Sequence, residues 1–352
     1  MVLFGSGALG RTLLRGLREE GIAVAAFSDN DARRWNSDVD GVPVYSPADV
    51  SARFGTRAAF FISVWNAGRR RNQTAIREQL AALGCREIFS FVELARCFPA
   101  RFLPYFAIDR HDAPLAAADE IDAAYELLAG ERSRAIFCEQ LEWRITADYA
   151  RLGSPGDEPQ YFPPDVYRLR EDERFVDCGA YDGDTLQQFL ALTRGAFDAY
   201  RALEPDPANF GRLRAAVESL PAAAGRKITC LPLAASDHRG TEQFDSRGSG
   251  SSTVSSAGET VIECAPLDDV IDSCTLIKLD VEGAEPRVLR GAQRLIRDHA
   301  PLLAVSAYHT QSHLWELPLL VHAMNGTYAL SYREHNEEGF DVVLYAVPRG
   351  RA

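Results

Sequence analysis

An acidic, glycine-rich segment gives the strongest chemical signal in the sequence, and it follows the short apolar run Phe175-Val176. Its residues are Asp177, Cys178, Gly179, Ala180, Tyr181, Asp182, Gly183, Asp184 and Thr185. Glycine lets a backbone approach a ligand closely, and a loop between a strand and a helix lies at the sheet edge where ligands bind. The aspartates and the lack of lysine disfavour phosphate. We expect residues 177 and 179–185 to bind a ligand with a cationic sulfonium and free hydroxyls, such as S-adenosylmethionine; the alternative is a solvated turn.

An acidic turn follows the next strand-like run, Ala199–Leu203, and consists of Glu204, Pro205 and Asp206. An acid at the end of the second strand can accept hydrogen bonds from ribose hydroxyls. We therefore predict that Glu204 binds the ribose and that the whole turn contacts the cofactor. Standing alone, Glu204 would be interpreted as a surface acid.

A third apolar run ends in small and polar residues, Ala234, Ala235, Ser236 and Asp237. Small side chains leave room for a flat adenine ring, and Ser236 or Asp237 could hydrogen-bond its amino group. Without the neighbouring motifs this pattern would only be a weak turn signal.

Candidate catalytic residues follow the next two strand-like runs. The run Leu276–Asp280 is followed by Glu282 and Glu285, and the run Leu302–Ala307 is followed by His309. Because the carboxyl ends of parallel strands share one sheet edge, these side chains should lie near the glycine loop. We expect Asp280 and Glu282 to contact the cofactor as well; a His at a strand end is otherwise often structural.

Methyl transfer to a hydroxyl needs alignment of the reacting atoms and removal of a proton. The unperturbed pKa of His, ~6.5, suits a base near neutrality better than that of a carboxylate, ~4. We therefore rank His309 as the base and Asp280 as its partner or as a group that positions the acceptor. Asp280, Glu282 and His309 could also hold Mg²⁺, but their spacing does not demand a metal and we predict none.

These motifs together resemble the FkbM family of methyltransferases over residues from about 120 to 348. The matching stretches are Phe175–Thr185, Leu203–Pro207, Ala234–Gly240, Pro266–Val270, Ile277–Arg290 and Val342–Pro348, preceded by Gln160–Pro163. The resemblance implies a class I fold, S-adenosylmethionine as methyl donor, and Tyr161 among the cofactor-binding residues. It usually implies an oxygen nucleophile on a sugar, a polyketide or a similar small molecule.

A second glycine pattern lies at the start of the chain. Gly5, Gly7 and Gly10 form a GxGxxG between a strand and a helix, and Asp29 follows the next strand about twenty residues later. This spacing is typical of a dinucleotide site whose acid binds a ribose, so a nucleotide such as NAD is a candidate ligand. The alternative is a Rossmann-like module used for packing or assembly.

The strands and helices expected from the sequence around these residues indicate an α/β chain of two domains. We expect a Rossmann-like nucleotide-binding domain at 1–95, a helical connector at 96–172 and a class I methyltransferase domain with a seven-stranded sheet at 173–352. Strands are expected at Val2–Phe4, Ala23–Phe27, Ala58–Ile62 and Glu87–Phe89, and then at Arg174–Asp177, Ala199–Leu203, Ile228–Pro232, Leu276–Asp280, Leu302–Ala307, Tyr328–Arg333 and Val342–Ala346. The first five of the second group should be separated by helices, and the last two should form an antiparallel hairpin.

Composition limits the partners. The 352 residues carry a formal net charge of −12, which disfavours nucleic acid, because such binding rests on Lys and Arg. The chain lacks a long apolar run, a signal-peptide pattern and a CxxC pair, so we expect a cytoplasmic protein that acts on a small-molecule acceptor and can form a homo-oligomer. The competing functions are an NAD(P)-dependent oxidoreductase and a non-catalytic nucleotide-binding protein.

Overall fold

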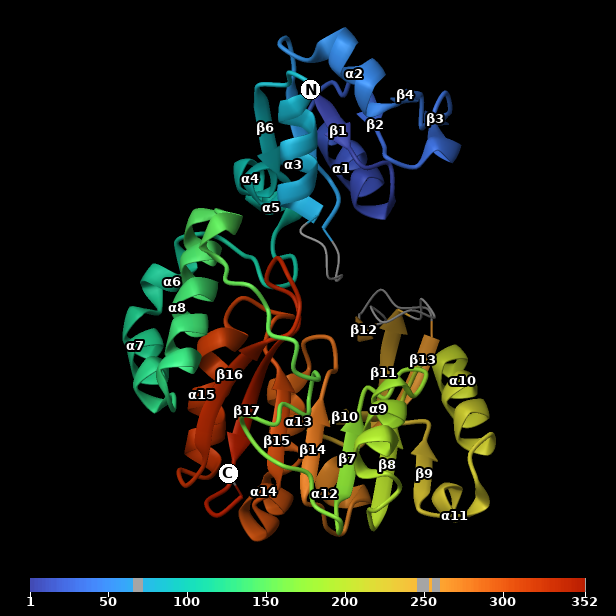
Figure 1. Cartoon of the computed structure of the whole chain (residues 1–352), viewed down its shortest axis with the longest axis vertical. Helices are drawn as coiled ribbons and strands as arrows, with labels where there is room; N and C mark the ends of the chain where they lie inside the picture. Colours follow the sequence, from blue (N-terminus) through green and yellow to red (C-terminus); the bar gives the residue numbers. More distant parts are fainter. Residues whose placement is uncertain (66–71, 246–252, 255–259, 352) are drawn as a thin grey trace. The chain divides into compact units, whose positions relative to one another are not determined.

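The computed structural model describes residues 1–65, 72–245, 253–254 and 260–351, and Figure 1 labels its helices and strands. The chain divides into two compact units, and each is built from three segments. Unit 1 comprises Met1–Ala118, Cys138–Pro155 and Asn336–Asp341, and unit 2 comprises Asp119–Phe137, Gly156–His335 and Val342–Ala352. The segment 96–172 is thus shared between the units. The glycine-serine run at 246–252 lies outside the described residues.

Unit 1 contains a six-stranded, mostly parallel sheet in the order β3-β4-β2-β1-β5-β6. Its strands are β1 (Val2–Phe4), β2 (Ala26–Ser28), β3 (Asp38–Val39), β4 (Val42–Tyr45), β5 (Ala59–Ile62) and β6 (Glu87–Ser90). The central strand β1 is fully buried, as expected for a parallel strand with helices on both faces of the sheet. The Rossmann-like parallel sheet predicted for this part of the chain is present.

Helices lie between these strands and after the last of them. They are α1 (Ala8–Glu19), α2 (Pro47–Phe54), α3 (Asn72–Ala82), α4 (Phe91–Cys97), α5 (Pro99–Phe102) and α6 (Ala113–Ala116). The sequence analysis missed β4 and α2, although α2 carries clear start signals. Pro47 occupies its first turn, and the Ser46 hydroxyl accepts a hydrogen bond from the Asp49 amide at 3.1 Å. Two further helices, α7 (Ala118–Leu127) and α8 (Glu131–Thr146), cross the boundaries between the units in sequence.

Unit 2 contains a seven-stranded sheet in the order β16-β17-β15-β14-β7-β8-β9. Its strands are β7 (Arg174–Cys178), β8 (Ala199–Leu203), β9 (Ile228–Leu231), β14 (Leu276–Leu279), β15 (Leu302–Ser306), β16 (Ala329–Glu334) and β17 (Val342–Val347). β17 runs antiparallel to both of its neighbours, which confirms the predicted hairpin. The order changes direction at β7, which places the loop after β7 between the ends of β14 and β8.

The helices of unit 2 flank this sheet, and four of them, α9, α10, α13 and α15, begin after the carboxyl ends of β7, β8, β14 and β15 (Figure 1). They are α9 (Asp184–Thr193), α10 (Pro207–Glu218), α11 (Ala222–Gly225), α12 (Leu267–Val270), α13 (Glu285–Arg290), α14 (Gln293–His299) and α15 (His313–Met324). Aromatic side chains fill the core on one face: Phe175, Phe189 and Tyr200 are fully buried and stack edge to face or at a tilt.

A separate four-stranded sheet lies between β9 and β14 in the chain, where the sequence analysis expected a helix. Its strands are β10 (Ala234–Ser236), β11 (Gly240–Asp245), β12 (Thr253–Val254) and β13 (Thr260–Pro266). The third strand of the main sheet therefore ends at Leu231. The sequence analysis wrongly expected Ala234–Ser236 to be the end of that strand, whereas these residues form β10 in the four-stranded sheet. The short strands of this sheet carry no long apolar run that would signal them.

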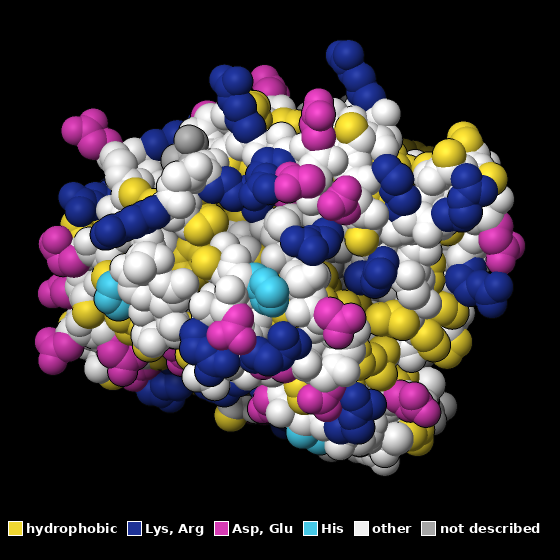
Figure 2. All heavy atoms as spheres, turned by 90° about the horizontal axis from the view of Figure 1, so that it is seen from below, with side chains coloured by type: hydrophobic (Ala, Val, Ile, Leu, Met, Phe, Trp, Pro, Cys, Tyr) yellow, Lys and Arg dark blue, Asp and Glu magenta, His cyan; other side chains and the backbone are white. Residues whose placement is uncertain are grey.

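Charged groups of both signs are distributed over the molecular surface. On the face shown in Figure 2, Lys and Arg side chains are interspersed with Asp and Glu. Within the described ranges, no helix is both long enough and apolar enough to span a bilayer.

The close approach of Gly291 to β10 yields a stability prediction. A Cβ at Gly291 would lie 1.9 Å from the Ser236 carbonyl oxygen, whereas a Cβ at Gly211, within α10, would meet nothing within 4 Å. We expect Gly291→Ala to lower the free energy of unfolding by about 1–3 kcal/mol because backbone must move. Gly211→Ala, the matched control, should be neutral or stabilising by roughly 0.5–1 kcal/mol. Denaturant unfolding of both variants measures this, and equal stabilities would contradict it.

Candidate functional site

The loop after β7 follows the sheet edge closely because of its glycines. Gly179 has φ 77° and Gly183, which precedes α9, has φ 93°, a region that favours glycine. A Cβ at Gly179 would lie 1.9 Å from the carbonyl oxygen of Asp280. Between them, Tyr181 also has a positive φ of 49°. The loop is therefore pressed against the end of β14 and presents its backbone at the carboxyl edge.

Asp177 lies beneath this loop and is fully buried. Its carboxylate is 3.0 Å from the Lys278 Nζ and accepts a hydrogen bond from the Tyr200 hydroxyl. Lys278 also donates to the Gly179 carbonyl oxygen at 2.6 Å. Burial raises the pKa of the Asp177 carboxyl, and the neighbouring charge of Lys278 opposes that shift. The sequence analysis expected Asp177 to contact the cofactor; the structure places it one layer below, where it fixes the loop.

Glu204 lies at the end of β8, on the other side of the loop. Its carboxylate accepts hydrogen bonds from the backbone amides of Tyr181 at 2.8 Å and Asp206 at 2.9 Å. Glu204 is only 5% exposed, and burial raises its pKa to about 7 despite these hydrogen bonds. The structure thus brings Glu204 and the glycine loop together, as the sequence analysis expected.

The other acids of these two turns have different surroundings. Asp206 is the N-cap of α10, because its side chain accepts from the amides of Ala208 and Asn209 at 2.9 and 3.1 Å. Asp184 is exposed in the first turn of α9, and Asp182 is partly exposed beside it. Of the remaining expected cofactor contacts, Ala180 and Thr185 are buried, whereas Tyr181 and Pro205 are partly exposed.

Ser236 and Asp237 end β10 and are bound by an arginine that the sequence analysis did not single out. Arg287, on α13, donates to the Ser236 hydroxyl at 2.7 Å and to Asp237 at 3.3 Å, and it also bonds Glu242. Ser236 is 2% exposed, whereas Asp237 is exposed. The polar atoms expected to contact adenine are therefore engaged by Arg287.

Tyr161 joins the site from the segment that precedes β7. Its hydroxyl donates to Asp280 Oδ2 at 2.9 Å, and the Lys278 Nζ lies 5.2 Å from the centre of its ring. Its backbone is held at φ 68°, with its amide donating to the Tyr345 hydroxyl at 3.2 Å. Only the family resemblance indicated this residue, since 119 positions separate it from Asp280.

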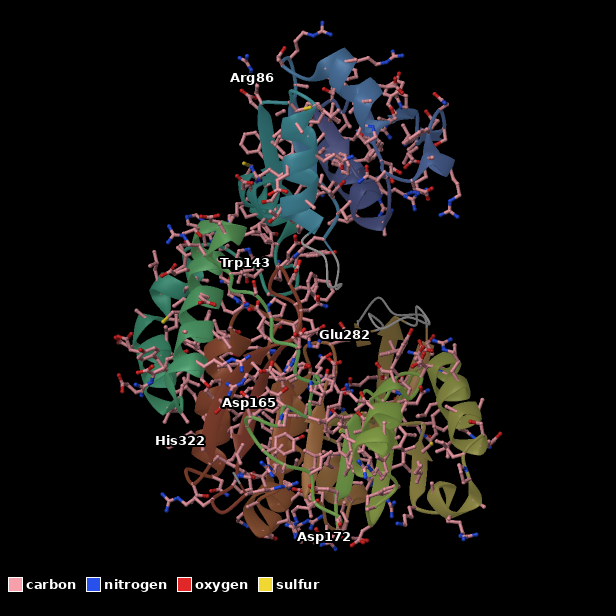
Figure 3. All side chains as sticks on the ribbon, viewed as in Figure 1. Arg86, Trp143, Asp165, Asp172, Glu282 and His322 are labelled. Atoms are coloured by element: carbon pink, nitrogen blue, oxygen red, sulfur yellow. The ribbon has the colours of Figure 1, made fainter. Side chains whose placement is uncertain are left out.

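His309 and three acids form a cluster at the ends of β14 and β15. His309 Nδ1 is 2.8 Å from Glu285 Oε1, and its Nε2 is 3.4 Å from Asp280 Oδ1 and 3.9 Å from Glu282 Oε2. Glu282, labelled in Figure 3, has a positive φ of 52° at the turn after β14. His313, which the sequence analysis missed, places its Nδ1 3.3 Å from Glu285 Oε2. The ring of His309 therefore faces Asp280, as expected.

The charge state of this cluster is unusual. Burial disfavours the charged form of His309, but the neighbouring carboxylates, first of all Glu285, outweigh it and raise the pKa of His309 to about 10. The same pairing lowers the pKa of Glu285 to about 2, although burial acts in the opposite direction. Because a general base must be neutral, His309 in this state does not take up a proton at neutral pH.

The glycine pattern of unit 1 has a structural explanation. A Cβ at Gly10 would lie 2.0 Å from the Gly5 carbonyl oxygen, so this glycine permits the close packing of α1 on the strand end. Asp29 already accepts hydrogen bonds from the Ser6 amide at 2.9 Å and from the Ser6 hydroxyl at 2.6 Å. Gly7 precedes α1. A Cβ at Gly7 would lie 3.8 Å from a guanidinium nitrogen of Arg34, which is an ordinary contact distance. Whether a nucleotide binds there stays a prediction.

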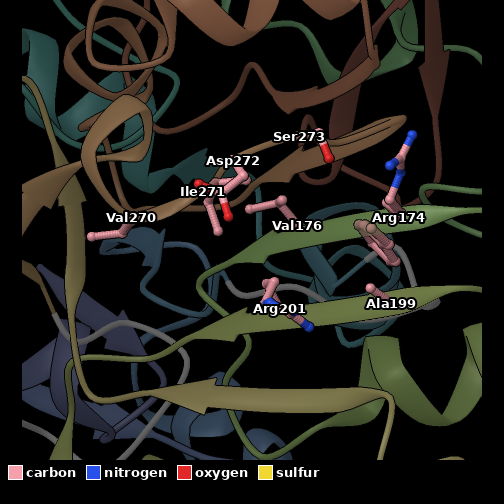
Figure 4. A pocket seen from close by; sticks show the side chains of 9 residues that line it. Arg174, Val176, Ala199, Arg201, Val270, Ile271, Asp272 and Ser273 are labelled. Atoms are coloured by element: carbon pink, nitrogen blue, oxygen red, sulfur yellow. The ribbon is translucent and has the colours of Figure 1, made fainter.

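A small pocket lies away from these residues. Figure 4 shows it at the amino ends of β7 and β8, where Arg174, Val176, Ala199 and Arg201 face the segment 270–273. This is the opposite sheet edge from the glycine loop, and none of the residues predicted to bind the cofactor lines it. In a doubly wound sheet, ligands bind at the carboxyl ends of the strands, so we do not assign a function to this pocket.

The part of the chain that carries the site is similar to known proteins. Residues 177–335 match the family model described as methyltransferase FkbM domain. The crystal structure of methyltransferase FkbM from Methylobacillus flagellatus KT superposes with a TM-score of 0.82 and 23% identity, covering 98% of this chain and 89% of that one. At that identity the likeness shows that the two chains share a fold. No match was found among curated protein sequences.

Two other methyltransferase structures are more distant. Fibrillarin from Aeropyrum pernix, solved with S-adenosylmethionine, has 13% identity and a TM-score of 0.34, covering 51% of this chain and 69% of that one. Precorrin-6y C5,15-methyltransferase from Geobacter metallireducens GS-15 has 16% identity and a TM-score of 0.33, covering 52% and 84%. These scores are too low to add to the assignment. Residues 177–335 are thus similar to the methyltransferase FkbM domain, and this match supports methyl transfer from S-adenosylmethionine.

Proposed function

We propose that the chain methylates a hydroxyl oxygen of a small molecule, such as a sugar or a polyketide, and that residues 173–352 carry the reaction. One observation carries this proposal: Asp280 and the buried residues His309 and Glu285 form an array at the ends of β14 and β15, on one side of the glycine loop. Glu204 lies on the other side, at the end of β8. The loop therefore separates a cofactor side from an acceptor side.

The cofactor side fits S-adenosylmethionine. When bound, this cofactor supplies an electrophilic methyl group on a positively charged sulfur. The φ of Gly179 and its contact with Asp280 leave a backbone surface free of side chain at the strand end. The Glu204 carboxylate, whose pKa burial raises to about 7, would be stabilised in its ionised form by hydroxyl donors from a ribose. We propose that Glu204 and residues 179–183 hold the cofactor.

The acceptor side fits an oxygen nucleophile. A hydroxyl must lose its proton as the new O–C bond forms, and the electron pair of the broken C–S bond stays on sulfur. Asp280 and Glu282 place carboxylate oxygens beside the imidazole of His309, so a hydroxyl there would meet acceptors for its proton. Because Glu285 keeps His309 protonated in this arrangement, we propose that His309 acts together with Asp280 and not as an isolated base.

The direct test uses methyl-labelled S-adenosylmethionine with the full chain and a panel of sugars and polyketide alcohols. We expect the label in an O-methyl ether that survives mild acid and base. Label found on nitrogen or carbon of the product would contradict the assignment of an oxygen acceptor while leaving methyl transfer intact.

Cofactor affinity should depend on pH through Glu204. Since the pKa of this carboxyl is raised to about 7 and the ribose prefers its ionised form, affinity should rise with pH and fall about tenfold between pH 8 and pH 6. Glu204→Gln removes the titrating group, so its affinity should be low and independent of pH over this range. Calorimetric titration of S-adenosylhomocysteine at several pH values measures both. A wild-type affinity that does not change with pH would show that Glu204 does not bind the ribose.

Loss of His309 should affect turnover far more than cofactor binding. Because His309 would position the Asp280 carboxylate as the proton acceptor, we expect His309→Ala to lower kcat about 10²–10⁴-fold, the usual contribution of a proton-transfer group, with affinity for S-adenosylhomocysteine within a few-fold. The control is His322→Ala, because His322 is exposed on α15 (Figure 3). Transfer of the labelled methyl group to the acceptor that the labelling experiment identifies measures turnover, and thermal unfolding checks that the variant is folded. A variant that is merely less stable, with unchanged kcat, would assign His309 a structural role.

A further inference from the structure

The orientation of the His309 ring is fixed by one particular carboxylate, that of Glu285. Glu285 is completely buried, and its Oε1 is 2.8 Å from His309 Nδ1 and 3.0 Å from the Val281 amide. A proton on Nδ1 is therefore directed at Glu285, and this fixes the ring so that Nε2 points the other way. A carboxylate that orients a histidine through one nitrogen and leaves the other exposed to a site is the usual support of a metal-binding histidine.

The atoms on the other side of the ring lack partners. Within the described part of the chain, His309 Nε2 and Asp280 Oδ1 are both buried without a hydrogen-bond partner, and the His309 side chain is only 2% exposed. Their separation of 3.4 Å is too long and poorly directed to be a hydrogen bond between them. Buried polar atoms without partners cost free energy, so such a pair calls for a ligand.

The spacing of these atoms suits a cation. Asp280 Oδ1 and Glu282 Oε2 lie 3.4 and 3.9 Å from His309 Nε2. Two donors that each bind one ion at about 2.1 Å lie roughly 3–4 Å apart. Donor atoms of Asp280, Glu285 and His309 also all lie within 4.8 Å of one another. The carboxylates of Asp280, Glu282 and Glu285 surround the buried imidazole of His309, so a positively charged ion is electrostatically favoured at this place.

We propose that His309 Nε2, Asp280 and Glu282 bind a divalent metal ion, with Glu285 as the positioning residue behind His309. One imidazole nitrogen with carboxylate oxygens suits Mn²⁺, Co²⁺ or Zn²⁺ better than the all-oxygen environment that Ca²⁺ prefers. Metal binding replaces the proton on Nε2, and that proton goes to solvent. The sequence analysis considered Asp280, Glu282 and His309 as ligands of Mg²⁺ but predicted no metal.

The role of the ion rests on the proposed function. A divalent ion lowers the pKa of a hydroxyl that it binds. The acceptor's proton would then pass to water before or during formation of the O–C bond, and His309 would not have to act as a base. The metal would thus let the cluster serve an oxygen nucleophile without a step in which His309 takes up a proton.

A second cluster in the same unit supplies a matched control. His238, Glu242 and Cys264 also lie close enough to share an ion. There, however, the Arg287 guanidinium already bonds Glu242 and lies 3.3 Å from His238 Nδ1, so a positive charge occupies the place a metal would take. We expect this cluster to bind no metal.

The test is a titration of the full chain with Mn²⁺. Binding is monitored as the loss of the electron paramagnetic resonance signal of the free ion. The wild-type chain should bind about one ion with an affinity in the micromolar range. Asp280→Asn keeps the shape of the side chain and should weaken binding at least tenfold, and His309→Ala should do the same. His238→Ala should bind as wild type does.

Two outcomes would overturn the proposal: no tight binding by the wild-type chain, or binding that survives Asp280→Asn and is lost in His238→Ala. Thermal unfolding identifies a variant that fails to fold. If His309→Ala does not fold, the affinity of Asp280→Asn for Mn²⁺ decides the test. Binding of S-adenosylhomocysteine, measured separately, tells a failed metal site from a failed methyltransferase assignment.

Discussion

A buried ion pair between Asp177 and Lys278 holds together the two strand ends on which the site is built. Asp177 ends the apolar part of β7 and Lys278 lies in the adjacent β14, with their charged atoms 3.0 Å apart and both side chains almost fully buried. Removing one partner of such a pair leaves an uncompensated buried charge, which is strongly destabilising. Through its bond to the Gly179 carbonyl, Lys278 also sets the path of the loop that approaches Asp280. The positions of the cofactor side and the acceptor side both depend on this contact.

The acids near this pair differ in role because their surroundings differ. Asp177 is neutralised by a lysine, Asp206 satisfies the amides at the start of a helix, and Glu285 fixes a histidine. Within the described ranges, the Glu204 carboxylate accepts from two backbone amides and the Asn209 side chain, and burial raises its pKa to about 7. Among the residues that the structure describes, one oxygen of Asp280 accepts from Tyr161 and the other has no hydrogen-bond partner. The acids that lack a complete set of partners in the protein are the ones we propose to meet ligands.

Sequence patterns predicted the main sheet well because buried parallel strands appear as nearly continuous apolar runs, as in Leu302–Ser306. In Leu276–Leu279 only Lys278 interrupts the run. They failed for the four-stranded sheet, since β13 mixes buried and exposed residues over seven positions. The cap role of Asp206 could have been predicted from the proline that follows it. The pairing of Glu285 with His309 could not, because the contact joins residues 24 positions apart through the packing of α13 on the sheet edge. Residue types and their approximate positions are thus accessible from sequence, whereas the partner of each acid is not.

The central claim is that the carboxyl edge of the seven-stranded sheet binds S-adenosylmethionine against the Gly179 loop. Calorimetric titration of S-adenosylhomocysteine into the full chain and into Gly179→Ala tests it most directly. Because a Cβ at position 179 would meet the Asp280 carbonyl at 1.9 Å, the substitution must displace the loop. We predict that the wild-type chain binds one molecule with micromolar-range affinity and that the variant, if folded, loses most of it. No binding to the folded wild-type chain, or equal affinity in the two proteins, would contradict the account.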